Sequence, residues 1–301
     1  MPEGLLPEPS RSQTGTVRVV VSLRHHVEGL PRDDFIRALV DRAQAAAAAA
    51  GELARNRPEV LEVDSKSCAT DVVTQMDRQC EQLLVSRLLD GRPDDGVLGE
   101  EGTDRVGTSG VRWVIDPIDG TVNYLYGLPY WAVCVGIELD GDAVGGVVNI
   151  PMFEEVYVAR KGHGAWCRTA AGERRLSVNP EQELSLALIA TGFGYAVSRR
   201  DAQAAVVREV VPKVRDIRRQ GSAAVDLCWL AAGRVDGYYE RGLHPWDLCA
   251  AGVVAREAGA VVGGQDGAPA GEDLVIAANP VLFARLDSLL TSLNAAGYVR
   301  D

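Results

Sequence analysis

The chain has 301 residues, which is long for one ordinary domain and suits one large domain or two coupled halves. Apolar residues make up 47% and charged residues 24%, as in globular proteins, so general disorder is excluded. The 31 lysines and arginines against 42 aspartates and glutamates give a formal net charge of −11, which disfavours direct binding to nucleic-acid phosphates.

The apolar runs and the cysteines bear on location. No apolar run approaches the roughly 18–20 residues that span a bilayer. Residues 1–30 contain no long apolar stretch typical of a secretory signal, and we expect them to form an N-terminal extension. The six cysteines contain no CxxC pair, which argues against a zinc ribbon or dithiol site and predicts buried thiols in a reducing cytoplasm.

The predicted elements change character along the chain. Apolar residues recur at helical spacing over 33–56 and 74–90, which predicts two amphipathic helices. Segments rich in β-formers and bounded by Gly, Pro and Asp predict strands at 111–115, 131–138, 143–150 and 155–159. Beyond residue 180 strands alternate with helices, an α/β pattern with strands at 186–191, 236–240 and 274–277 and helices at 199–214, 222–233, 247–258 and 280–294.

This change of pattern predicts two subdomains. Residues 31–180 are expected to form an α+β half that carries most of the candidate metal ligands. Residues 181–301 are expected to form an α/β half that completes the site. No long linker separates the halves, so we expect them to share one active cleft.

The most informative window is WVIDPIDGTVN, at 113–123. An apolar strand delivers Asp116 at its end, and Pro117 is expected to stop the strand ladder because it has no N–H to donate. Asp119 follows three residues after Asp116, so both carboxylates can face one point, with the Ile118 carbonyl as a third oxygen.

Gly120 and Thr121 then open a predicted helix, whose free backbone amides suit an anionic group. Hard oxygen ligands beside an anion pocket are typical of a magnesium site that also takes a substrate phosphate. The alternative for this window alone is an ordinary turn, with Asp and Gly in their usual turn positions.

Two other windows add carboxylates. Glu100 and Glu101 follow a short apolar run and are expected at a strand end, although glutamate pairs are more often solvated surface. Asp247, in HPWDLCAAG (244–252), lies where a helix of small residues begins, directly after the strand predicted at 236–240. An aspartate there is otherwise a helix N-cap.

Together these windows resemble the inositol monophosphatase family of magnesium-dependent, lithium-sensitive phosphatases. The two signatures of that family match WVIDPIDGTVNY (113–124) and WDLCAAG (246–252), and further matches run in the family's order over 66–252. ATGFGY (190–195) is most similar to the bacterial, SuhB-type members. The resemblance implies a layered α/β/α/β/α fold of the sugar phosphatase type, and a homodimer.

The resemblance also implies a ligand set for up to three Mg²⁺ ions. The first ion would be held by Glu100, Asp116 and the Ile118 carbonyl, the second by Asp116, Asp119 and Asp247, and a weak third near Glu100. Such ions neutralise a phosphate monoester dianion and activate the attacking water, so no protein nucleophile is required.

By the same resemblance Thr121 orients and deprotonates the attacking water, with Asp77 as its partner. From the residues alone, the spacing of Thr74 and Asp77 fits a capping box equally well. The amides of Gly120 and Thr121 would hold the phosphate. Lys66 matches a basic residue near the metals, although a single lysine is otherwise a solvated side chain.

The substrate pocket is implied in the same way. Glu240 would accept hydrogen bonds from ring hydroxyls, beside a wall of Gly221, Ser222 and Ala223, with Asp247 also in contact with the substrate. The alternative for Glu240 is a charge at a strand end. The implied reaction is hydrolysis of myo-inositol 1-phosphate to inositol and phosphate.

Two alternatives stay open from the sequence. The same metal motifs serve fructose 1,6-bisphosphatase, histidinol-phosphatase and 3′-phosphoadenosine 5′-phosphate phosphatase, because metal ligands report the reaction and the pocket wall decides the substrate. The chain could also be a regulatory interaction protein that uses this fold. We assign no role to the four histidines.

Overall fold

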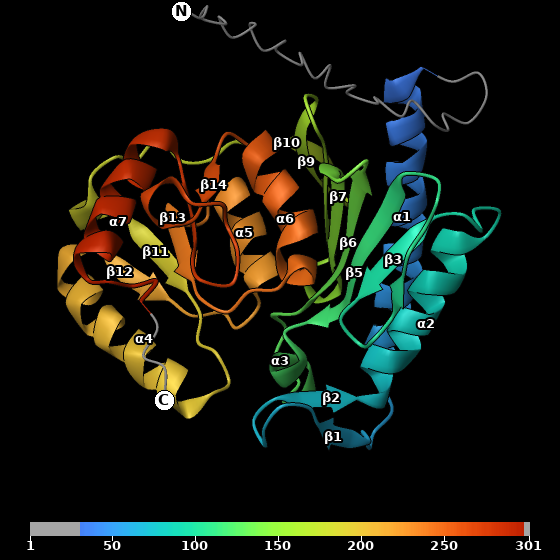
Figure 1. Ribbon diagram of the computed structural model, residues 1–301, viewed down its shortest axis with the longest axis horizontal. Helices are drawn as coiled ribbons and strands as arrows, with labels where there is room; N and C mark the ends of the chain where they lie inside the picture. The colour runs from blue at the N-terminus through green and yellow to red at the C-terminus, as the bar shows by residue number, and fades with distance from the viewer. Residues whose placement is uncertain (1–30, 298–301) are drawn as a thin grey trace, which may run out of the picture.

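A computed structural model describes residues 31–297 of the chain. Its elements form five layers: two long helices, an eight-stranded sheet, two further helices, a five-stranded sheet and an outer pair of helices (Figure 1). This order is the predicted α/β/α/β/α arrangement. The extension expected at 1–30 lies outside the described residues.

The first layer contains α1 (Arg32–Arg55) and α2 (Gln75–Leu89). Both lie within a residue or two of the predicted ranges. Alanine, the strongest helix former, fills the interior of α1, and its buried side chains recur every three or four residues. α1 packs on β6, β7 and β8 through this face, and the buried residues are Phe35, Ile36, Leu39, Val40, Ala43, Ala46, Ala47, Ala50, Gly51 and Ala54.

The eight-stranded sheet has the strand order β10-β9-β8-β7-β6-β5-β3-β4. All neighbouring pairs are antiparallel except β3 and β5, which run parallel. Its strands are β3 (Gly96–Gly99), β4 (Asp104–Arg105), β5 (Val111–Asp119), β6 (Ala132–Leu139), β7 (Asp142–Ile150), β8 (Glu155–Arg160), β9 (Gly164–Thr169) and β10 (Gly172–Arg175).

Strand β5 corrects one expectation. The strand does not stop at Pro117 but continues to Asp119, and its pairing with β6 shifts register between Asp116 and Asp119. Proline is tolerated at such an irregularity because no ladder N–H is needed there. In a regular strand, residues three apart point to opposite faces, and an extra residue restores the same face. The irregularity therefore lets both carboxylates point to one side.

Below this sheet in Figure 1, a small hairpin lies beside the short helix α3 (Thr121–Leu125). The hairpin contains β1 (Val63–Ser65) and β2 (Val72–Thr74), and β2 leads directly into α2. The sequence did not predict these two strands, because each has only three residues and β1 is fully exposed.

The middle layer contains α5 (Ala223–Ala231) and α6 (Pro245–Glu257). Helix α6 packs against β5, β6, β7, β8 and β9. Two glycines of the sheet make this approach possible: a Cβ on Gly146 would lie 2.3 Å from the Ala250 carbonyl oxygen, and a Cβ on Gly136 would meet Cys249 Sγ. The small residues of α6 therefore lie directly on the backbone of the sheet.

The five-stranded sheet has the order β12-β11-β13-β15-β14 and is covered by α4 (Val197–Val210) and α7 (Pro280–Ser292). Its strands are β11 (Leu188–Thr191), β12 (Asp216–Arg218), β13 (Gly237–Glu240), β14 (Val261–Gly263) and β15 (Val275–Ala278). β11 runs parallel to β12 and β13, and the remaining pairs are antiparallel. Four 3₁₀ turns lie at Pro151–Phe153, Leu184–Leu186, Val211–Lys213 and Gln265–Gly267.

The predicted helices and strands are present, whereas β9 and short strands such as β4, β10, β12 and β14 were not predicted. The chain passes from the eight-stranded to the five-stranded sheet between β10 and β11, which brackets the boundary expected near 180. The division into two subdomains stays a prediction.

All six cysteines are free thiols, but Cys68 and Cys249 are only partly buried, contrary to expectation. Within 31–297, no helix combines the length and apolarity needed to cross a bilayer.

Candidate functional site

A cavity of about 410 Å³ opens between the two sheets. It lies where β3, β5 and β13 end and where α3, α5 and α6 begin, and the loops after β1 and β11 and the start of α4 also contribute to its wall. The predicted site residues that line it are Glu100, Asp116, Ile118, Asp119, Gly120, Thr121, Gly221, Ser222, Ala223, Glu240 and Asp247. Asp77 is the one predicted site residue outside this lining, since it lies behind Thr121.

Three carboxylates converge in this cavity. Asp116 and Asp119 from the end of β5 and Asp247 from the first turn of α6 each offer an oxygen, and these atoms lie within 4.8 Å of one another. Backbone and hydroxyl donors orient the three groups. Asp116 accepts from the Ile118 amide at 3.0 Å, Asp119 from the Ala224 amide at 2.7 Å and from the Ser222 hydroxyl, and Asp247 from the His244 amide at 2.7 Å.

The cluster is electrostatically unfavourable by itself. Burial, and then repulsion by neighbouring carboxylates, raise the pKa of Asp116 and of Asp247 well above its usual range. Burial also raises the pKa of Asp119 to about 6, although its donors at Ser222 and Ala224 oppose the shift. Buried carboxylate oxygens that repel one another are the donor set that a hard divalent cation compensates. These three residues could therefore hold a metal ion.

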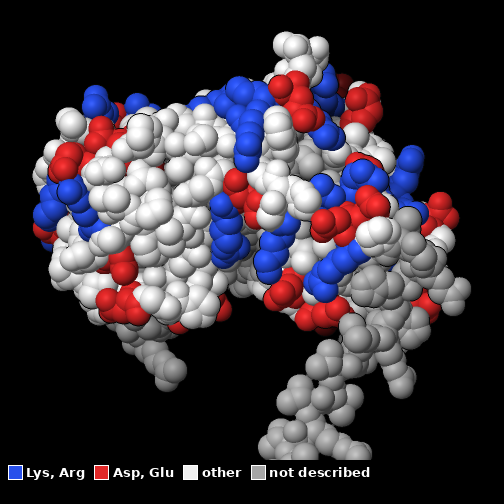
Figure 2. All heavy atoms as spheres, turned by 90° about the horizontal axis from the view of Figure 1, so that it is seen from above, with Lys and Arg blue, Asp and Glu red and all other residues white. Residues whose placement is uncertain are grey.

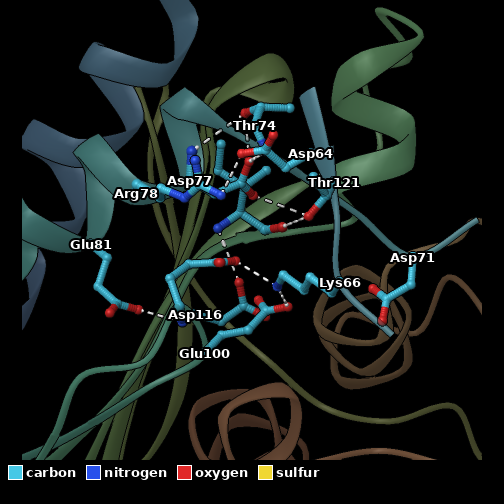
Figure 3. Close-up of polar contacts among 12 residues, drawn as sticks. Asp64, Lys66, Asp71, Thr74, Asp77, Arg78, Glu81, Glu100, Asp116 and Thr121 are labelled. Atoms are coloured by element: carbon cyan, nitrogen blue, oxygen red, sulfur yellow. Dashed lines mark hydrogen bonds and ion pairs between the residues drawn. The ribbon is translucent and has the colours of Figure 1, made fainter. Parts of the chain in front are cut away.

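Glu100 lies at the edge of this group, directly after β3 (Figure 3). It forms a side-chain hydrogen bond with Asp116 that contributes to the raised pKa of the latter. Lys66 Nζ contacts Glu100 Oε1 at 2.8 Å and Glu101 Oε1 at 2.7 Å. Burial lowers the pKa of Lys66, but the two glutamates outweigh it and the net pKa is raised. The Lys66 ammonium is therefore ion-paired at the edge of the site, with 25% of its side chain exposed.

The neighbouring Glu101 is more buried than its position in a charge pair suggested. Burial and repulsion by Glu100 raise the pKa of Glu101 to about 7, against the lowering effect of Lys66. Its backbone amide donates to Glu81 at 2.8 Å. Glu100 thus lines the cavity and the Glu101 side chain is buried behind it, so neither is a solvated surface carboxylate.

Asp77 forms the capping box of α2 and also contacts Thr121, while its catalytic role stays a prediction (Figure 3). Its Oδ2 accepts from the Thr74 amide at 2.8 Å and from the Thr74 hydroxyl at 2.5 Å, while the Thr74 hydroxyl accepts from the amides of Met76 and Asp77, which is a capping box for α2. Its Oδ1 accepts from Thr121 Oγ1 at 3.1 Å. Burial raises the pKa of Asp77.

The Thr121 hydroxyl lies between two acceptors. Oγ1 is 3.1 Å from Asp77 Oδ1 and also 3.1 Å from the Ile118 carbonyl oxygen. One hydroxyl has one proton, so it can donate to only one of them at a time. If the Ile118 carbonyl oxygen binds another group, the Thr121 hydroxyl is left to donate its proton to Asp77.

Gly120 makes the turn from β5 into α3. Its φ of 96° is left-handed, and a Cβ there would lie 2.8 Å from the Tyr130 carbonyl oxygen. Only glycine fits both conditions. This turn places the start of α3, with the Thr121 side chain, at the metal-ligand cluster.

The opposite wall carries Glu240 at the end of β13. Glu240 Oε2 accepts from the Tyr238 hydroxyl at 2.7 Å. Burial raises the pKa of Glu240 to about 7, while the Tyr238 bond lowers it. Ser222, the N-cap of α5, accepts from Val225 at 3.2 Å and donates to Asp119, so the wall and the carboxylate cluster are linked directly.

Several lining residues were not predicted as site residues, because loops and helix ends far apart in the chain contribute them. They are Phe193, Gly194, Tyr195, Arg199, Arg219, Arg241, Trp246 and Glu272. Phe193, Gly194, Tyr195 and Trp246 lie within the motifs quoted above, but which residues of those motifs face the cavity depends on how the two sheets meet.

Comparison with known proteins agrees with this geometry. The model of the inositol monophosphatase family matches residues 34–296. The chain belongs to this family. An inositol-1-monophosphatase of Mycobacterium leprae is 44% identical over 246 residues, covering 79% of this chain and 84% of the relative. A protein named Nus factor SuhB, from Vibrio cholerae, is 37% identical over 218 residues, covering 70% and 79%.

Solved structures show the same fold. The extragenic suppressor protein suhB of Bartonella henselae superimposes with a TM-score of 0.78 at 35% identity, covering 84% of this chain and 98% of that chain. Mycobacterium tuberculosis SuhB gives a TM-score of 0.75 at 41% identity, covering 87% and 98%. The fold class and the assignment as a phosphatase of the inositol monophosphatase family are therefore confirmed.

Proposed function

We propose that the protein is a Mg²⁺-dependent phosphatase that hydrolyses myo-inositol 1-phosphate to inositol and phosphate. The observation that carries this proposal is the convergence of Asp116, Asp119 and Asp247 in one cavity with Glu240 on its opposite wall. The three aspartates suit a metal and a phosphate, and Glu240 suits the hydroxyl groups of the alcohol that leaves.

The residues present fit the metal. Glu100, Asp116, Asp119 and Asp247, with the Ile118 carbonyl, offer only oxygen donors, and magnesium prefers such donors. When bound, the ion would lower the pKa of a water molecule and stabilise the leaving alkoxide. Lys66 fits beside this set, because it keeps Glu100 and Glu101 neutralised on the outer side.

The remaining roles belong to the chain itself. Thr121 Oγ1 accepts a hydrogen bond from the attacking water and donates its own proton to Asp77 Oδ1, which holds the water in line with phosphorus. The amides of Gly120 and Thr121 bind the phosphate at the start of α3. Asp77 stays oriented because its second oxygen is held by Thr74.

The wall around Glu240 supports the choice of substrate. Its carboxylate accepts hydrogen bonds from ring hydroxyls, and Gly221, Ser222 and Ala223 form the neighbouring surface. Asp247 reaches the same space from the metal side. Inositol 1-phosphate offers both a phosphate and a ring of hydroxyl groups. Several relatives named inositol-1-monophosphatase, at up to 44% identity, support this choice.

The test is phosphate release from a panel of monoesters with Mg²⁺, run beside Asp119→Asn. The panel contains inositol 1-phosphate, fructose 1,6-bisphosphate, histidinol phosphate and 3′-phosphoadenosine 5′-phosphate. We expect preference for inositol 1-phosphate, a loss of roughly 10²-fold or more in the variant, and inhibition by lithium. Preference for another ester, with the variant still inactive, would overturn inositol 1-phosphate as the substrate and still support metal-dependent hydrolysis of a phosphate monoester.

We also propose a homodimer. The supporting feature is an apolar surface beside α3, where Tyr126 (76% exposed), Leu128 (48%) and Met152 (49%) are exposed. Residues of the same segments, Tyr130 and Phe153, form an aromatic cluster with Trp229. Large exposed apolar groups that cluster are typical of protein interfaces. Sedimentation of the wild-type protein and of Leu128→Glu would test this proposal: a dimer in the first and a monomer in the second are expected.

A cytoplasmic location fits the six free thiols, because a reducing compartment keeps thiols unpaired.

A second candidate function, as an interaction protein, is supported by two relatives named Nus factor SuhB. The formal net charge of −11 disfavours nucleic-acid phosphates and so favours a protein partner, and on the face shown in Figure 2 basic side chains are interspersed with acidic ones. A cellular role that persists in Asp116→Asn would separate this function from catalysis.

A further inference from the structure

The position of the Glu240 carboxylate depends on a neighbour that has no side chain. Glu240 is the last residue of β13. In the adjacent strand β11, Thr191 pairs with Tyr239 of β13, and this pairing brings the next residue, Gly192, beside Glu240. A Cβ on Gly192 would lie 2.1 Å from Glu240 Oε2 and 2.2 Å from Oε1. Because atoms in a close-packed protein do not approach so closely, the carboxylate occupies the space of the missing side chain.

The backbone at Gly192 is held in place by α4. Gln203, which is 6% exposed, donates from Nε2 to the Gly192 carbonyl at 3.4 Å and accepts from the Gly194 amide at 2.8 Å. Gly192 is not among the residues with positive φ, so alanine could adopt its backbone conformation. A methyl group at this position would therefore displace the flexible Glu240 carboxylate and leave the strand where it is.

Displacement of the carboxylate would affect one end of the cavity only. Gly192 and Glu240 both line the cavity on the side of the five-stranded sheet, and Tyr238 holds Glu240 Oε2 at 2.7 Å. The three-carboxylate cluster draws its members from β5 and α6 instead. A change at Gly192 should thus alter contacts to the alcohol part of a substrate and leave the phosphate end unchanged.

We propose that Gly192 is a specificity-determining positioning residue, whose missing side chain lets Glu240 accept hydrogen bonds from the hydroxyl groups of a cyclic polyol phosphate. This inference rests on the function proposed above. It predicts that a side chain at 192 weakens selection for polyol esters over esters that carry no hydroxyl groups, without weakening hydrolysis itself.

The experiment compares inositol 1-phosphate with phenyl phosphate, a monoester without hydroxyl groups, in wild type and Gly192→Ala with Mg²⁺. We expect the KM for inositol 1-phosphate to rise roughly tenfold, as for loss of a hydrogen bond to a charged group. Values of kcat/KM for phenyl phosphate should stay within about twofold. Gly271→Ala is the matched control, because no atom lies within 4 Å of its Cβ.

A double-mutant cycle with Glu240→Ala separates positioning from general damage. If Gly192 acts through Glu240, then Gly192→Ala should add almost nothing in the Glu240→Ala background. Additive losses in the double variant, equal losses on both esters, or an unchanged KM for inositol 1-phosphate would each overturn the inference. Failure of the proposed function is visible in the wild-type protein alone: release of no phosphate from either ester would overturn both proposals, and preference for another ester in the panel above would overturn the substrate before any change at Gly192 is measured.

Discussion

At the residue scale, two carboxylates of the site each combine a helix-capping bond with a place among the candidate site residues. Asp77 caps α2 with Oδ2 and accepts from Thr121 with Oδ1. Asp247 accepts from the His244 amide with Oδ2 and belongs to the metal-ligand cluster as well. The structural and the catalytic interpretations of these residues do not exclude each other, because the capping bond orients the group that the site needs.

This division of labour predicts that stability and turnover can be separated at Asp77. Thr121→Val removes the hydroxyl that donates to Asp77 Oδ1. We expect kcat to fall by roughly 10²-fold or more, with little change in the free energy of unfolding. Thr121→Ser should keep most of the activity. Thr74→Ala removes the cap instead and should reduce the free energy of unfolding by about 1 kcal/mol. Steady-state kinetics and urea unfolding measure the two effects; a fully active Thr121→Val would contradict the assignment.

Asp116 offers a second test at this scale. Burial and the surrounding carboxylates make its ionised form unfavourable without a cation. Asp116→Asn should therefore raise the thermal midpoint of the metal-free protein while it reduces Mg²⁺-dependent turnover by roughly 10²-fold or more. Thermal unfolding in the presence of a chelator, beside phosphate release, checks both. A midpoint that falls would show that Asp116 is stabilising by itself, contrary to this prediction.

At the scale of elements, the site depends on how closely α6 lies on the eight-stranded sheet. Asp247 is in the first turn of α6, whereas Asp116 and Asp119 are in β5, so their separation is set by the packing of helix on strand. Gly136 and Gly146 let Cys249 and Ala250 approach the sheet backbone. The register shift in β5 then brings its two aspartates to the side that faces the helix.

A side chain at Gly146 should consequently disturb metal binding from a distance. The Ala250 carbonyl is a backbone atom at 2.3 Å from the missing Cβ, so it cannot move without moving α6. We expect Gly146→Ala to lower the free energy of unfolding by roughly 1–3 kcal/mol and to weaken Mg²⁺ affinity. Calorimetric titration with Mg²⁺ checks the second effect, with Gly271→Ala as the control. Unchanged affinity would mean that α6 accommodates the methyl group without moving Asp247.

At the scale of the whole molecule, the site joins two halves that each contribute acid groups. The eight-stranded sheet and α6 supply the candidate metal ligands, and the five-stranded sheet supplies Glu240. Burial raises the pKa of Asp119 from 3.8 to about 6 and that of Glu240 from 4.5 to about 7. An acid with a raised native pKa binds its proton more tightly in the folded state, so it favours folding at low pH.

The metal-free protein should therefore lose stability as pH rises from about 4 through 7, the window between the unfolded and native pKa values of these acids. We expect a lower thermal midpoint at alkaline than at mildly acidic pH, and recovery at alkaline pH on addition of Mg²⁺. Glu240→Gln should show a smaller dependence on pH. Identical pH profiles for wild type and Glu240→Gln would contradict the raised pKa of Glu240.

The sequence alone determined much of the fold and most of the candidate site. Helical periodicity over 33–56 and 74–90 and the runs of β-formers are local signals, so the long elements were predictable. The two motifs around Asp116 and Asp247 are local as well, and their resemblance to the inositol monophosphatase family implied the candidate metal ligands. The continuation of β5 past Pro117 was not predictable, because the pairing with β6 decides where that strand ends.

Only the tertiary structure decided which residues share one cavity. Lys66, in the loop after β1, pairs with Glu100 and Glu101 after β3 only because the fold brings these two segments together. The contact of Gly192 with Glu240 exists because β11 and β13 are neighbours although 45 residues or more separate them in the chain. Sequence patterns report local conformation and motif chemistry, whereas distances between segments depend on side-chain packing across the two sheets, which no local pattern specifies.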